Sequence, residues 1–389
     1  MLKSQPKLKI KRTYRKIHIS FFIGSLGIGG TEKQLLNLIN SLDKKKFKID
    51  LYLLMKEKGD LFVDLDSSVR VFLPKYKFES ILSHFLNFIV NYFRISKTKP
   101  EIIHCFLPLA YLMGGLIGIL NNHQNIIMSR RSLNDYQKRF KFFPVRRIEL
   151  FLHKKIKLII ANSNAVKKNL IDEGAPKEKL RVIYNGFINT KYNHKESRAK
   201  LKESLAIKRN SFVFLVLANL IPYKNHKLVI GAADLLRKLT KKNFKIIFLG
   251  SGQRKYKLSL KNMIKERGVE DHFIFKNSTK KINNFLKITD VGISSSLEEG
   301  LSNSLIEFIS LGIPTIATNV GGNSEITNNR NGFLIESNNE EQLMKAMKSF
   351  MLDKKLQNKK SLISKNDSKK FSLNKMVENH IALYKELRN

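Results

Sequence analysis

The segment at residues 298–307 combines two carboxylates with a short polar turn, in the order E-E-G-L-S-N-S-L-I-E. Glu299 and Glu307 lie eight residues apart, and the small residues between them predict that a helix begins near Ser304. One carboxylate would then precede the helix N-terminus and the other would lie a turn into it, with backbone amides between them. Carboxylates suit sugar and ribose hydroxyls, and helix N-terminal amides suit a diphosphate. Helix capping by acidic residues is the structural alternative.

A glycine-rich loop at residues 24–32, G-S-L-G-I-G-G-T-E, follows a predicted strand over Ile17–Ile23 and precedes a predicted helix at residues 32–42. Glycines let backbone N–H groups approach an anion, and the following helix N-terminus favours negative charge. The loop does not keep the G-x-G-x-x-G spacing of dinucleotide-binding proteins. Two interpretations of this loop therefore remain, a phosphate contact and a tight strand-to-helix turn.

Strand-like and helix-like segments alternate along most of the chain, which is typical of parallel sheets built from βαβ units. The first series predicts strands at residues 17–23, 49–54, 102–105, 126–128, 158–161 and 181–183. The series then restarts, with strands at residues 212–218, 245–249, 273–275, 291–294 and 315–317. We therefore expect an α/β protein of two Rossmann-like domains with a cleft between them, and ligands at the carboxyl ends of the strands.

The polar, basic stretch at residues 191–210 is the expected seam between these domains. The expected divisions are a basic N-terminal tail at 1–16, an N-terminal domain at 17–200, a C-terminal domain at 201–371 and a C-terminal helix at 372–389. The pattern does not decide on which domain that last helix docks.

Composition restricts the class of protein. The 389 residues contain 26 Phe and 11 Tyr, enough for packed cores despite a formal net charge of +40. The lone Cys105 excludes a disulfide framework and a cysteine-based zinc site. The basic start leads into an apolar run too short for a signal peptide or a membrane span. We expect a cytoplasmic protein, either soluble or peripheral to the membrane.

Two segments concentrate the positive charge. Residues 3–16 carry seven basic and no acidic residues, and residues 138–157 carry eight basic residues and one acidic residue, interleaved with aromatic and aliphatic ones. The second pattern suits an interfacial helix on anionic lipid, although nucleic acid also binds such patches. A lysine-rich genome composition is the third interpretation. An anionic membrane surface is favoured over nucleic acid, since no nucleic-acid-binding motif is present.

The motif at residues 299–307, with its continuation to residue 322, resembles the E-x7-E signature of the family-4 retaining glycosyltransferases. Four further segments resemble the family in order: residues 29–32 (G-G-T-E), 182–186 (V-I-Y-N-G), 218–225 (A-N-L-I-P-Y-K-N) and 249–252 (L-G-S-G). The resemblance covers roughly residues 17–340 and implies the two-domain GT-B fold. It also implies a hexosyltransferase type of activity that needs no metal ion and no cofactor besides its nucleotide-sugar co-substrate, with UDP favoured over GDP.

The resemblance implies a role for each matching position. Glu307 would hold the nucleotide ribose, and Glu299 would contact hydroxyls of the donor sugar. Lys224 and backbone amides would bind the diphosphate, whose negative charge grows as it leaves. The remaining donor-binding positions are Gly29, Gly30, Asn219, Gly250, Leu301, Ser302, Asn303 and Ser304.

Two positions depart from the family pattern. Asn219 stands where the family usually has an arginine, five residues before the phosphate-binding lysine, and Arg254 is a possible substitute. Arg130 and Arg131 follow the predicted strand at residues 126–128, where the family often has a histidine. Either arginine could contact the acceptor or the diphosphate, and a solvent-exposed pair is the alternative. A retaining mechanism with phosphate as the base does not need a histidine there.

Four further residues have side chains that could bind a ligand or a metal ion. His104, placed after a strand at residues 102–103, would touch the acceptor at the cleft, and a packing histidine is the competing view. Asp64 and Asp66 form a D-x-D that lacks the context of a metal site and suits the surface. Ser163 is expected to cap a helix.

The sequence therefore predicts a retaining glycosyltransferase. It would move a sugar from a nucleotide donor to a lipid-linked or glycan acceptor, in surface polysaccharide or lipopolysaccharide synthesis at the inner face of the cell membrane. A GT-B nucleotide-sugar epimerase and a non-catalytic nucleic-acid-binding protein on the same scaffold are the alternatives. The donor sugar, the acceptor, the linkage and the oligomeric state are not encoded in any motif.

Overall fold

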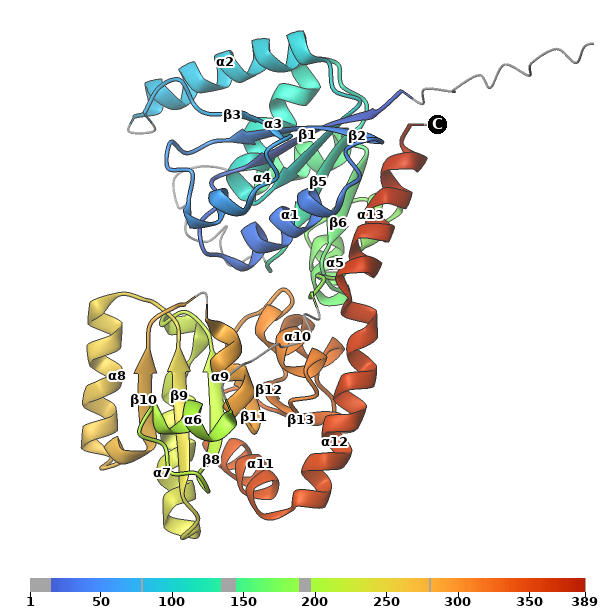
Figure 1. Cartoon of the computed structure of the whole chain (residues 1–389). Helices are drawn as coiled ribbons and strands as arrows, with labels where there is room; N and C mark the ends of the chain where they lie inside the picture. Colours follow the sequence, from blue (N-terminus) through green and yellow to red (C-terminus); the bar gives the residue numbers. More distant parts are fainter. Residues whose placement is uncertain (1–14, 78–79, 134–144, 189–196, 280, 389) are drawn as a thin grey trace, which may run out of the picture. The chain divides into compact units, whose positions relative to one another are not determined.

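The structure, a computed structural model, describes residues 15–77, 80–133, 145–188, 197–279 and 281–388 of the chain (Figure 1). It divides into two compact units. Unit 1 comprises Met1–Met128, Lys155–Leu158 and His380–Asn389, and unit 2 comprises Ser129–Lys154 and Ile159–Asn379. Nearly all of the basic tail and residues 191–196 of the predicted seam lie outside the described residues, whereas residues 197–210 of the seam are described and belong to unit 2.

The first half of the described chain forms a seven-stranded sheet in the order β3-β2-β1-β4-β5-β6-β7. Every pairing with a described register in it is parallel, as βαβ units require. The strands are β1 (Ile17–Ile23), β2 (Phe47–Leu53), β3 (Arg70–Phe72), β4 (Ile102–Phe106), β5 (Ile126–Arg130), β6 (Leu158–Ala161) and β7 (Leu180–Val182). The helices are α1 (Gly30–Ser41), α2 (Ile81–Thr98), α3 (Pro108–Leu120), α4 (Val145–Lys155) and α5 (Asn164–Asp172).

The second half forms a six-stranded parallel sheet in the order β10-β9-β8-β11-β12-β13. Its strands are β8 (Phe212–Leu217), β9 (Phe244–Leu249), β10 (Phe273–Lys276), β11 (Val291–Ser294), β12 (Thr315–Thr318) and β13 (Gly332–Ile335). Its helices are α6 (Arg198–Glu203), α7 (His226–Leu239), α8 (Arg254–Glu266), α9 (Ile282–Ile288), α10 (Asn303–Ser310), α11 (Glu340–Leu352) and α12 (Lys354–Asp367). The strand order reverses between β8 and β11, so the loops after these two strands meet where α/β proteins bind ligands.

The two predicted series of strands are both confirmed. The predicted strand bounds agree with the structure to within two residues, and those of β1, β6 and β11 agree at both ends. Strands β3 and β13, which are edge strands of three and four residues, were not predicted. The C-terminal helix is α13 (Leu373–Glu386), whose first residues belong to unit 2 and whose residues from His380 onward belong to unit 1.

The expected position of His104, beyond the end of its strand, is wrong. β4 continues to Phe106, so His104 lies inside the strand and is fully buried. Its Nδ1 is 2.8 Å from the Tyr384 hydroxyl, and its ring lies 5.6 Å from Phe21 and 4.4 Å from Phe106, centroid to centroid. These contacts within unit 1 are those of a packing histidine, and its contact with an acceptor stays a prediction.

Arg130 is likewise not in the loop where the sequence placed it, because β5 continues through it. The guanidinium is 1% exposed and donates to Glu173 at 3.0 Å, to Glu149 at 3.4 Å and to the Ser132 carbonyl at 3.0 Å. Burial, together with this cation, lowers the pKa of the neighbouring His153 to about 4, so that the imidazole is neutral at pH 7. A buried charge is tolerated only when it is paired, as here.

Replacing Arg130 should therefore lower the free energy of unfolding of the protein. Arg130→Met leaves Glu149 and Glu173 buried without their cation, and we expect a loss of about 3–5 kcal/mol in the free energy of unfolding. Chemical denaturation measures it. Arg146→Met, at an exposed position of α4, is the matched control and should change stability by less than about 0.5 kcal/mol. Equal stabilities of the two variants would contradict a structural role for Arg130.

Candidate active site

The predicted E-x7-E segment forms a loop after β11 that leads into α10. Ser302 is the N-cap of this helix, and its hydroxyl accepts from the Leu305 amide at 3.4 Å. Glu299 precedes the helix and Glu307 is buried one turn inside it, as predicted. The first-turn amides of α10 thus carry the partial positive charge of a helix N-terminus between the two carboxylates.

Lys224 and Glu299, predicted to act on different parts of the donor, form an ion pair with each other. Lys224 Nζ lies 2.5 Å from Glu299 Oε1, which also accepts from the Ser296 hydroxyl at 2.7 Å. Burial alone would lower the pKa of Lys224, but the negative charge of Glu299 and the hydrogen bond to it outweigh burial and raise it. The lysine is therefore cationic at neutral pH, beside the loop that opens α10.

Three glycines allow the backbone of Glu299 and Gly300 to be enclosed by other backbone. A Cβ on Gly321 would lie 1.7 Å from the Glu299 carbonyl oxygen, and one on Gly322 would lie 2.4 Å from the Gly300 carbonyl oxygen. A Cβ on Gly300 would lie 2.3 Å from the carbonyl oxygen of Arg131. Since no side chain fits at these positions, the glycines fix where the Glu299 carboxylate starts.

Arg131, unlike Arg130, reaches this loop through a chain of side chains. Its guanidinium donates to Asn185 Oδ1, and Asn185 Nδ2 donates to Asn303 Oδ1 at 2.7 Å. Asn303 is the first residue of α10, so the chain ends at the helix N-terminus. Arg131, Asn185 and Asn303 all belong to unit 2. Arg131 is thus one of the predicted residues that the structure brings to the motif.

Asn219 and Gly250 follow β8 and β9, where the two loops approach closely. A Cβ on Gly250 would lie 2.0 Å from the Ala218 carbonyl oxygen and 3.1 Å from the Cα of Asn219. Asn219 itself is exposed, as is Arg254 at the start of α8. Gly250 therefore shapes the loop that carries Asn219, and whether Arg254 replaces the missing arginine stays a prediction.

Gly29 and Gly30 belong to unit 1, at the start of α1. Gly29 is the N-cap residue, and the Glu32 carboxylate folds back so closely that a Cβ on Gly29 would lie 2.1 Å from Glu32 Oε2. Burial raises the pKa of Glu32. The glycines thus make a tight strand-to-helix turn, and their contact with donor phosphates stays a prediction.

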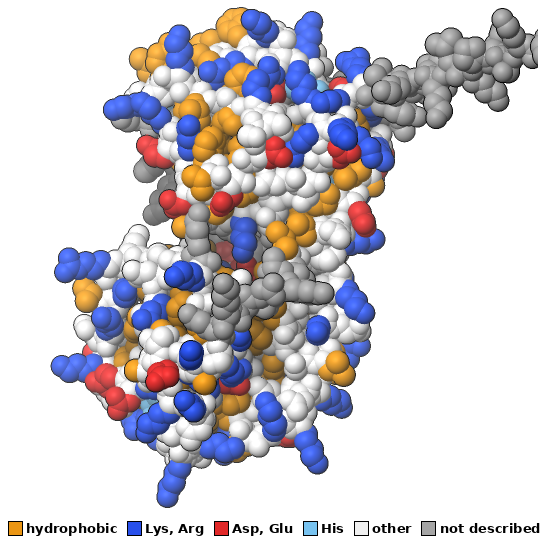
Figure 2. Space-filling view, viewed as in Figure 1, with side chains coloured by type: hydrophobic (Ala, Val, Ile, Leu, Met, Phe, Trp, Pro, Cys, Tyr) orange, Lys and Arg blue, Asp and Glu red, His pale blue; other side chains and the backbone are white. Residues whose placement is uncertain are grey.

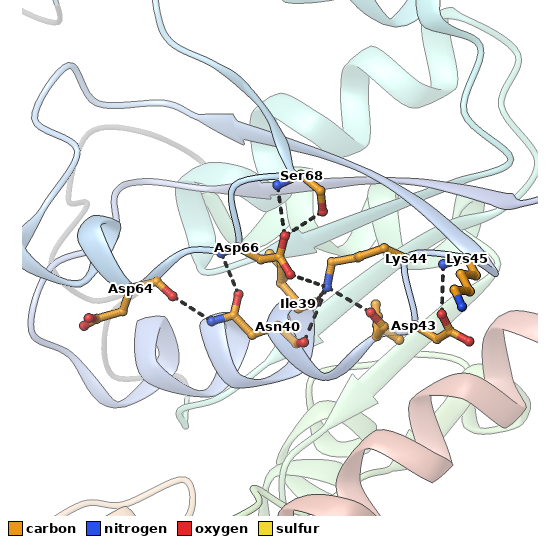
Figure 3. Close-up of polar contacts among 9 residues, drawn as sticks. Ile39, Asn40, Asp43, Lys44, Lys45, Asp64, Asp66 and Ser68 are labelled. Atoms are coloured by element: carbon orange, nitrogen blue, oxygen red, sulfur yellow. Dashed lines mark hydrogen bonds and ion pairs between the residues drawn. The ribbon is translucent and has the colours of Figure 1, made fainter.

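The D-x-D at residues 64–66 has structural contacts, as Figure 3 shows. Asp66 Oδ1 accepts from the amide and hydroxyl of Ser68, at 2.9 and 2.6 Å, and Asp66 Oδ2 lies 3.5 Å from Lys44 Nζ. Asn40 ties both ends together, donating to the Asp64 carbonyl at 2.7 Å and accepting from the Asp66 amide at 3.0 Å. Asp66 therefore stabilises a surface turn, as expected.

No group of three or more His, Cys, Asp or Glu side chains is placed to hold a metal ion within the residues that the structure describes. Metal independence stays a prediction.

Several residues at the motif were not assigned a contact by sequence reasoning. Asn185 lies in the V-I-Y-N-G segment, which was matched to the family without a role. Ser163 caps α5 as predicted, accepting from the Val166 amide at 3.0 Å, and it also donates to the Gly300 carbonyl at 2.7 Å. In the sequence, only the glycines around the motif and the asparagine of V-I-Y-N-G could have indicated these contacts.

Glu325 is a further contact that the sequence did not indicate. Its carboxylate accepts from the Asn164 and Ala165 amides at the start of α5, at 3.0 and 2.9 Å, and from the Tyr184 hydroxyl at 2.8 Å. Burial, followed by this hydrogen bond, raises the pKa of Tyr184 to about 12. Glu325 therefore caps α5 from the loop after β12.

The close contacts of these glycines predict that adding a single methyl group at Gly321 lowers both stability and activity. Gly321→Ala places a Cβ against the Glu299 carbonyl at a residue with φ of +49°, and we expect both lower stability and loss of activity. Gly268→Ala is the matched control, since φ there is +59° but no atom lies within 4 Å of the added Cβ. The control should lose only the strain of order 1–3 kcal/mol and keep its activity. Thermal unfolding and turnover measure both, and equal activity of the two variants would contradict the contact.

Family models match the two halves of the chain. Residues 28–189 match Glycosyltransferase Family 4, and residues 197–367 match Glycosyl transferases group 1, so the two models together span most of the chain.

Characterised relatives match over nearly their full length. One is the UDP-Gal:alpha-D-GlcNAc-diphosphoundecaprenol alpha-1,3-galactosyltransferase of Escherichia coli, 27% identical over 96% of this chain and 98% of that protein. Another is the capsular polysaccharide biosynthesis glycosyltransferase CapH of Staphylococcus aureus, 24% identical over 95% of this chain and 98% of that one.

Solved structures share the fold. Anabaena HepE in complex with UDP and glucose matches with a TM-score of 0.82 at 20% identity, over 94% of this chain and 99% of that one. A glycosyltransferase from Rickettsia africae matches with a TM-score of 0.80 at 22% identity, over 97% of this chain and 100% of that one. The chain is an enzyme that belongs to the Family 4 glycosyltransferases of GT-B fold, as its motifs predicted.

Proposed function

We propose that this enzyme transfers a sugar from a UDP-sugar, with retention of the anomeric configuration, to a lipid-linked acceptor during surface polysaccharide synthesis. The observation that carries the proposal is the cationic Lys224, paired with Glu299 in the loop that leads into α10, at the point where the strand order of the second sheet reverses. The names of the relatives support the acceptor class: one acts on a diphosphoundecaprenol-linked sugar and another belongs to capsule synthesis.

The leaving group determines the chemistry that the site must perform. As the bond from the anomeric carbon to the diphosphate breaks, negative charge grows on the departing oxygen. Lys224 and the first-turn amides of α10 are preorganised to stabilise that charge. The acceptor hydroxyl attacks from the same face of the sugar, and its proton goes to the departing phosphate, so no side-chain base is needed.

The carboxylates would hold the rest of the donor. Glu307, buried inside α10, would bind the ribose hydroxyls, and Glu299 would bind hydroxyls of the sugar. Because Lys224 and Glu299 pair with each other, a bound diphosphate would share the lysine with the carboxylate. That pairing keeps the ammonium in place, which reduces the reorganisation needed when the donor arrives.

Arg131 rather than Arg130 is the arginine that we place in the reaction. It is only half-buried and bonds through Asn185 to the first residue of α10, so it can position the helix N-terminus or contact the diphosphate. Arg130 has its guanidinium enclosed by two carboxylates and serves the fold.

Release of nucleoside diphosphate from a panel of nucleotide sugars tests the proposal, with and without lipid extract. Wild type should release UDP only when a suitable acceptor is present. Lys224→Met should lower kcat by on the order of 10²–10³ because a stabilising charge is lost, and Glu307→Ala should abolish donor use. Lys227→Met, at an exposed position nearby in α7, should keep wild-type rates.

Other results would point away from transfer. Release with donor alone would favour an epimerase or hydrolase. Binding of generic DNA without any binding of a nucleotide sugar would favour the nucleic-acid-binding alternative. Equal rates for Lys224→Met and Lys227→Met would contradict the assigned site.

The stereochemistry provides a second, independent prediction. With an α-linked donor, proton NMR of the product should show a new α-linkage, because the acceptor attacks the face from which the diphosphate departs. The coupling constant of the anomeric proton distinguishes the two outcomes. A β-linked product would contradict the retaining mechanism while leaving the donor site intact.

The same proposal places the enzyme at the inner face of the cell membrane, where a lipid-linked acceptor and a soluble nucleotide sugar are both accessible. The structure holds no helix that is both long and apolar enough to cross a bilayer, as far as the described residues extend.

A further inference from the structure

Helix α2 (Ile81–Thr98) in unit 1 has an apolar outer face. Ile81 is 90% exposed, and Leu82, Phe85 and Phe93 are 65%, 58% and 64% exposed. Leu82, Phe85 and Phe93 recur at intervals of three and eight residues, with the half-buried Ile89 between them, so they form one stripe along the helix. Large apolar side chains gathered on one exposed face mark an interaction surface.

The inner face of α2 includes two buried asparagines, whereas an ordinary surface helix buries mainly apolar side chains. Its buried residues are Asn87, Asn91 and Ile95. Asn87 accepts from the Tyr76 amide at 3.1 Å and donates to the Tyr76 carbonyl at 2.9 Å, and Asn91 accepts from Arg94 at 3.1 Å. These hydrogen bonds hold this face inward, so the apolar stripe is exposed by the fold itself.

Positive charge accompanies the stripe. No Asp or Glu occurs within α2, and the exposed Lys97 lies in its last turn. Arg94 does not add charge to the outer face, because its guanidinium donates to the Leu73 carbonyl at 2.8 Å and to Asn91. The two bonds from Asn87 hold the segment at residues 75–77, K-Y-K, against the helix, and both of its lysines are exposed. In Figure 2, hydrophobic side chains gather over α2 with Lys and Arg side chains around them and few acidic ones.

The two segments that were predicted from the sequence to contact the membrane show less exposed apolar surface among the described residues than α2 does. Residues 3–16 lie almost wholly outside the described chain. Of residues 138–157, the described part includes α4, which buries Val145 and Leu152 and exposes Phe151 by about half.

We propose that the outer face of α2 docks this enzyme on an anionic lipid bilayer. The apolar stripe would enter the boundary between headgroups and acyl chains, with the helix in the plane of the membrane, while neighbouring lysines contact the lipid phosphates. The combination of exposed apolar residues, cations and no carboxylate within the helix matches a lipid surface better than a protein partner, whose interface would offer specific polar pairs. This inference rests on the proposed lipid-linked acceptor. It identifies the surface through which the enzyme would contact the membrane that holds that acceptor.

The chain contains no tryptophan, so a single introduced indole reports on this face alone. Phe85→Trp should show a blue-shifted emission when vesicles of phosphatidylglycerol and phosphatidylethanolamine are added, and a much smaller shift with phosphatidylcholine vesicles. Leu258→Trp, at a 49% exposed position of α8 in unit 2, is the matched control and should show no shift.

Removal of the stripe tests the same surface without a probe. Leu82→Ser/Phe85→Ser/Phe93→Ser should lower the vesicle partition coefficient at least about tenfold in co-sedimentation, since three apolar side chains no longer enter the lipid. The control Leu258→Ser/Leu362→Ser also removes exposed apolar side chains and should bind as wild type. Circular dichroism should show equal folding, because the substituted side chains are exposed.

The outcomes of these experiments distinguish a failure of the docking surface from a failure of the proposed glycosyltransferase activity. Vesicle binding that the triple variant retains would overturn the inference, as would a blue shift that depends on protein concentration and needs no vesicles, which would indicate a protein interface. Vesicle binding uses no nucleotide sugar, so a protein that docks through α2 but transfers nothing would refute the proposed function alone. Transfer to a lipid acceptor with full activity in the triple variant would refute the docking surface alone.

Discussion

The backbone of Glu299 and Gly300 is surrounded by the backbone of residues 321–322 and of residue 131, at distances that exclude any Cβ. Peptide groups that approach so closely have few alternative arrangements, since close-packed interiors do not deform continuously. The position of the Glu299 carboxylate follows from that constraint. Its ion pair with Lys224 then fixes the ammonium beside the loop that leads into α10. The position of this ion pair thus depends on glycines that carry no chemistry themselves.

The second sheet explains why these parts meet. Lys224 follows β8 and Glu299 follows β11, and these strands are neighbours in a sheet whose order reverses between them. A cation and an anion separated by 75 residues therefore lie side by side. The helix after β11 contributes its N-terminal dipole at the same place. A parallel sheet with this topology therefore brings together two segments that are far apart in the sequence, the one after β8 and the one after β11.

Much of this could be predicted from the sequence, for identifiable reasons. Strand β8 is a continuous apolar run and β1 and β11 are largely apolar, each bounded by turn residues, and the E-x7-E segment indicates where the helix begins. Polar residues inside strands were harder to place. Arg130 was assigned to a loop because its partners, Glu149 and Glu173, lie 19 and 43 residues away and no local pattern reveals them.

The same limit applies to other contacts. His104 pairs with Tyr384, 280 residues away, so only the folded chain reveals that it packs inside unit 1. The bond from Asn185 to Asn303 and that from Ser163 to Gly300 also join distant segments. Local periodicity predicts secondary structure, whereas contacts of this kind need the three-dimensional arrangement. The exposure of the apolar face of α2 was not predicted for a related reason. Periodicity alone does not reveal which face of a helix is buried.

The most direct test of the account compares the binding of UDP and of uridine by titration calorimetry. If Lys224 and the N-terminus of α10 form the diphosphate site, wild type should bind UDP at least about tenfold more tightly than uridine. Lys224→Met should lose most of that difference while binding uridine as before. Equal affinities of wild type for UDP and uridine, or an unchanged difference in the variant, would contradict the assignment of this site.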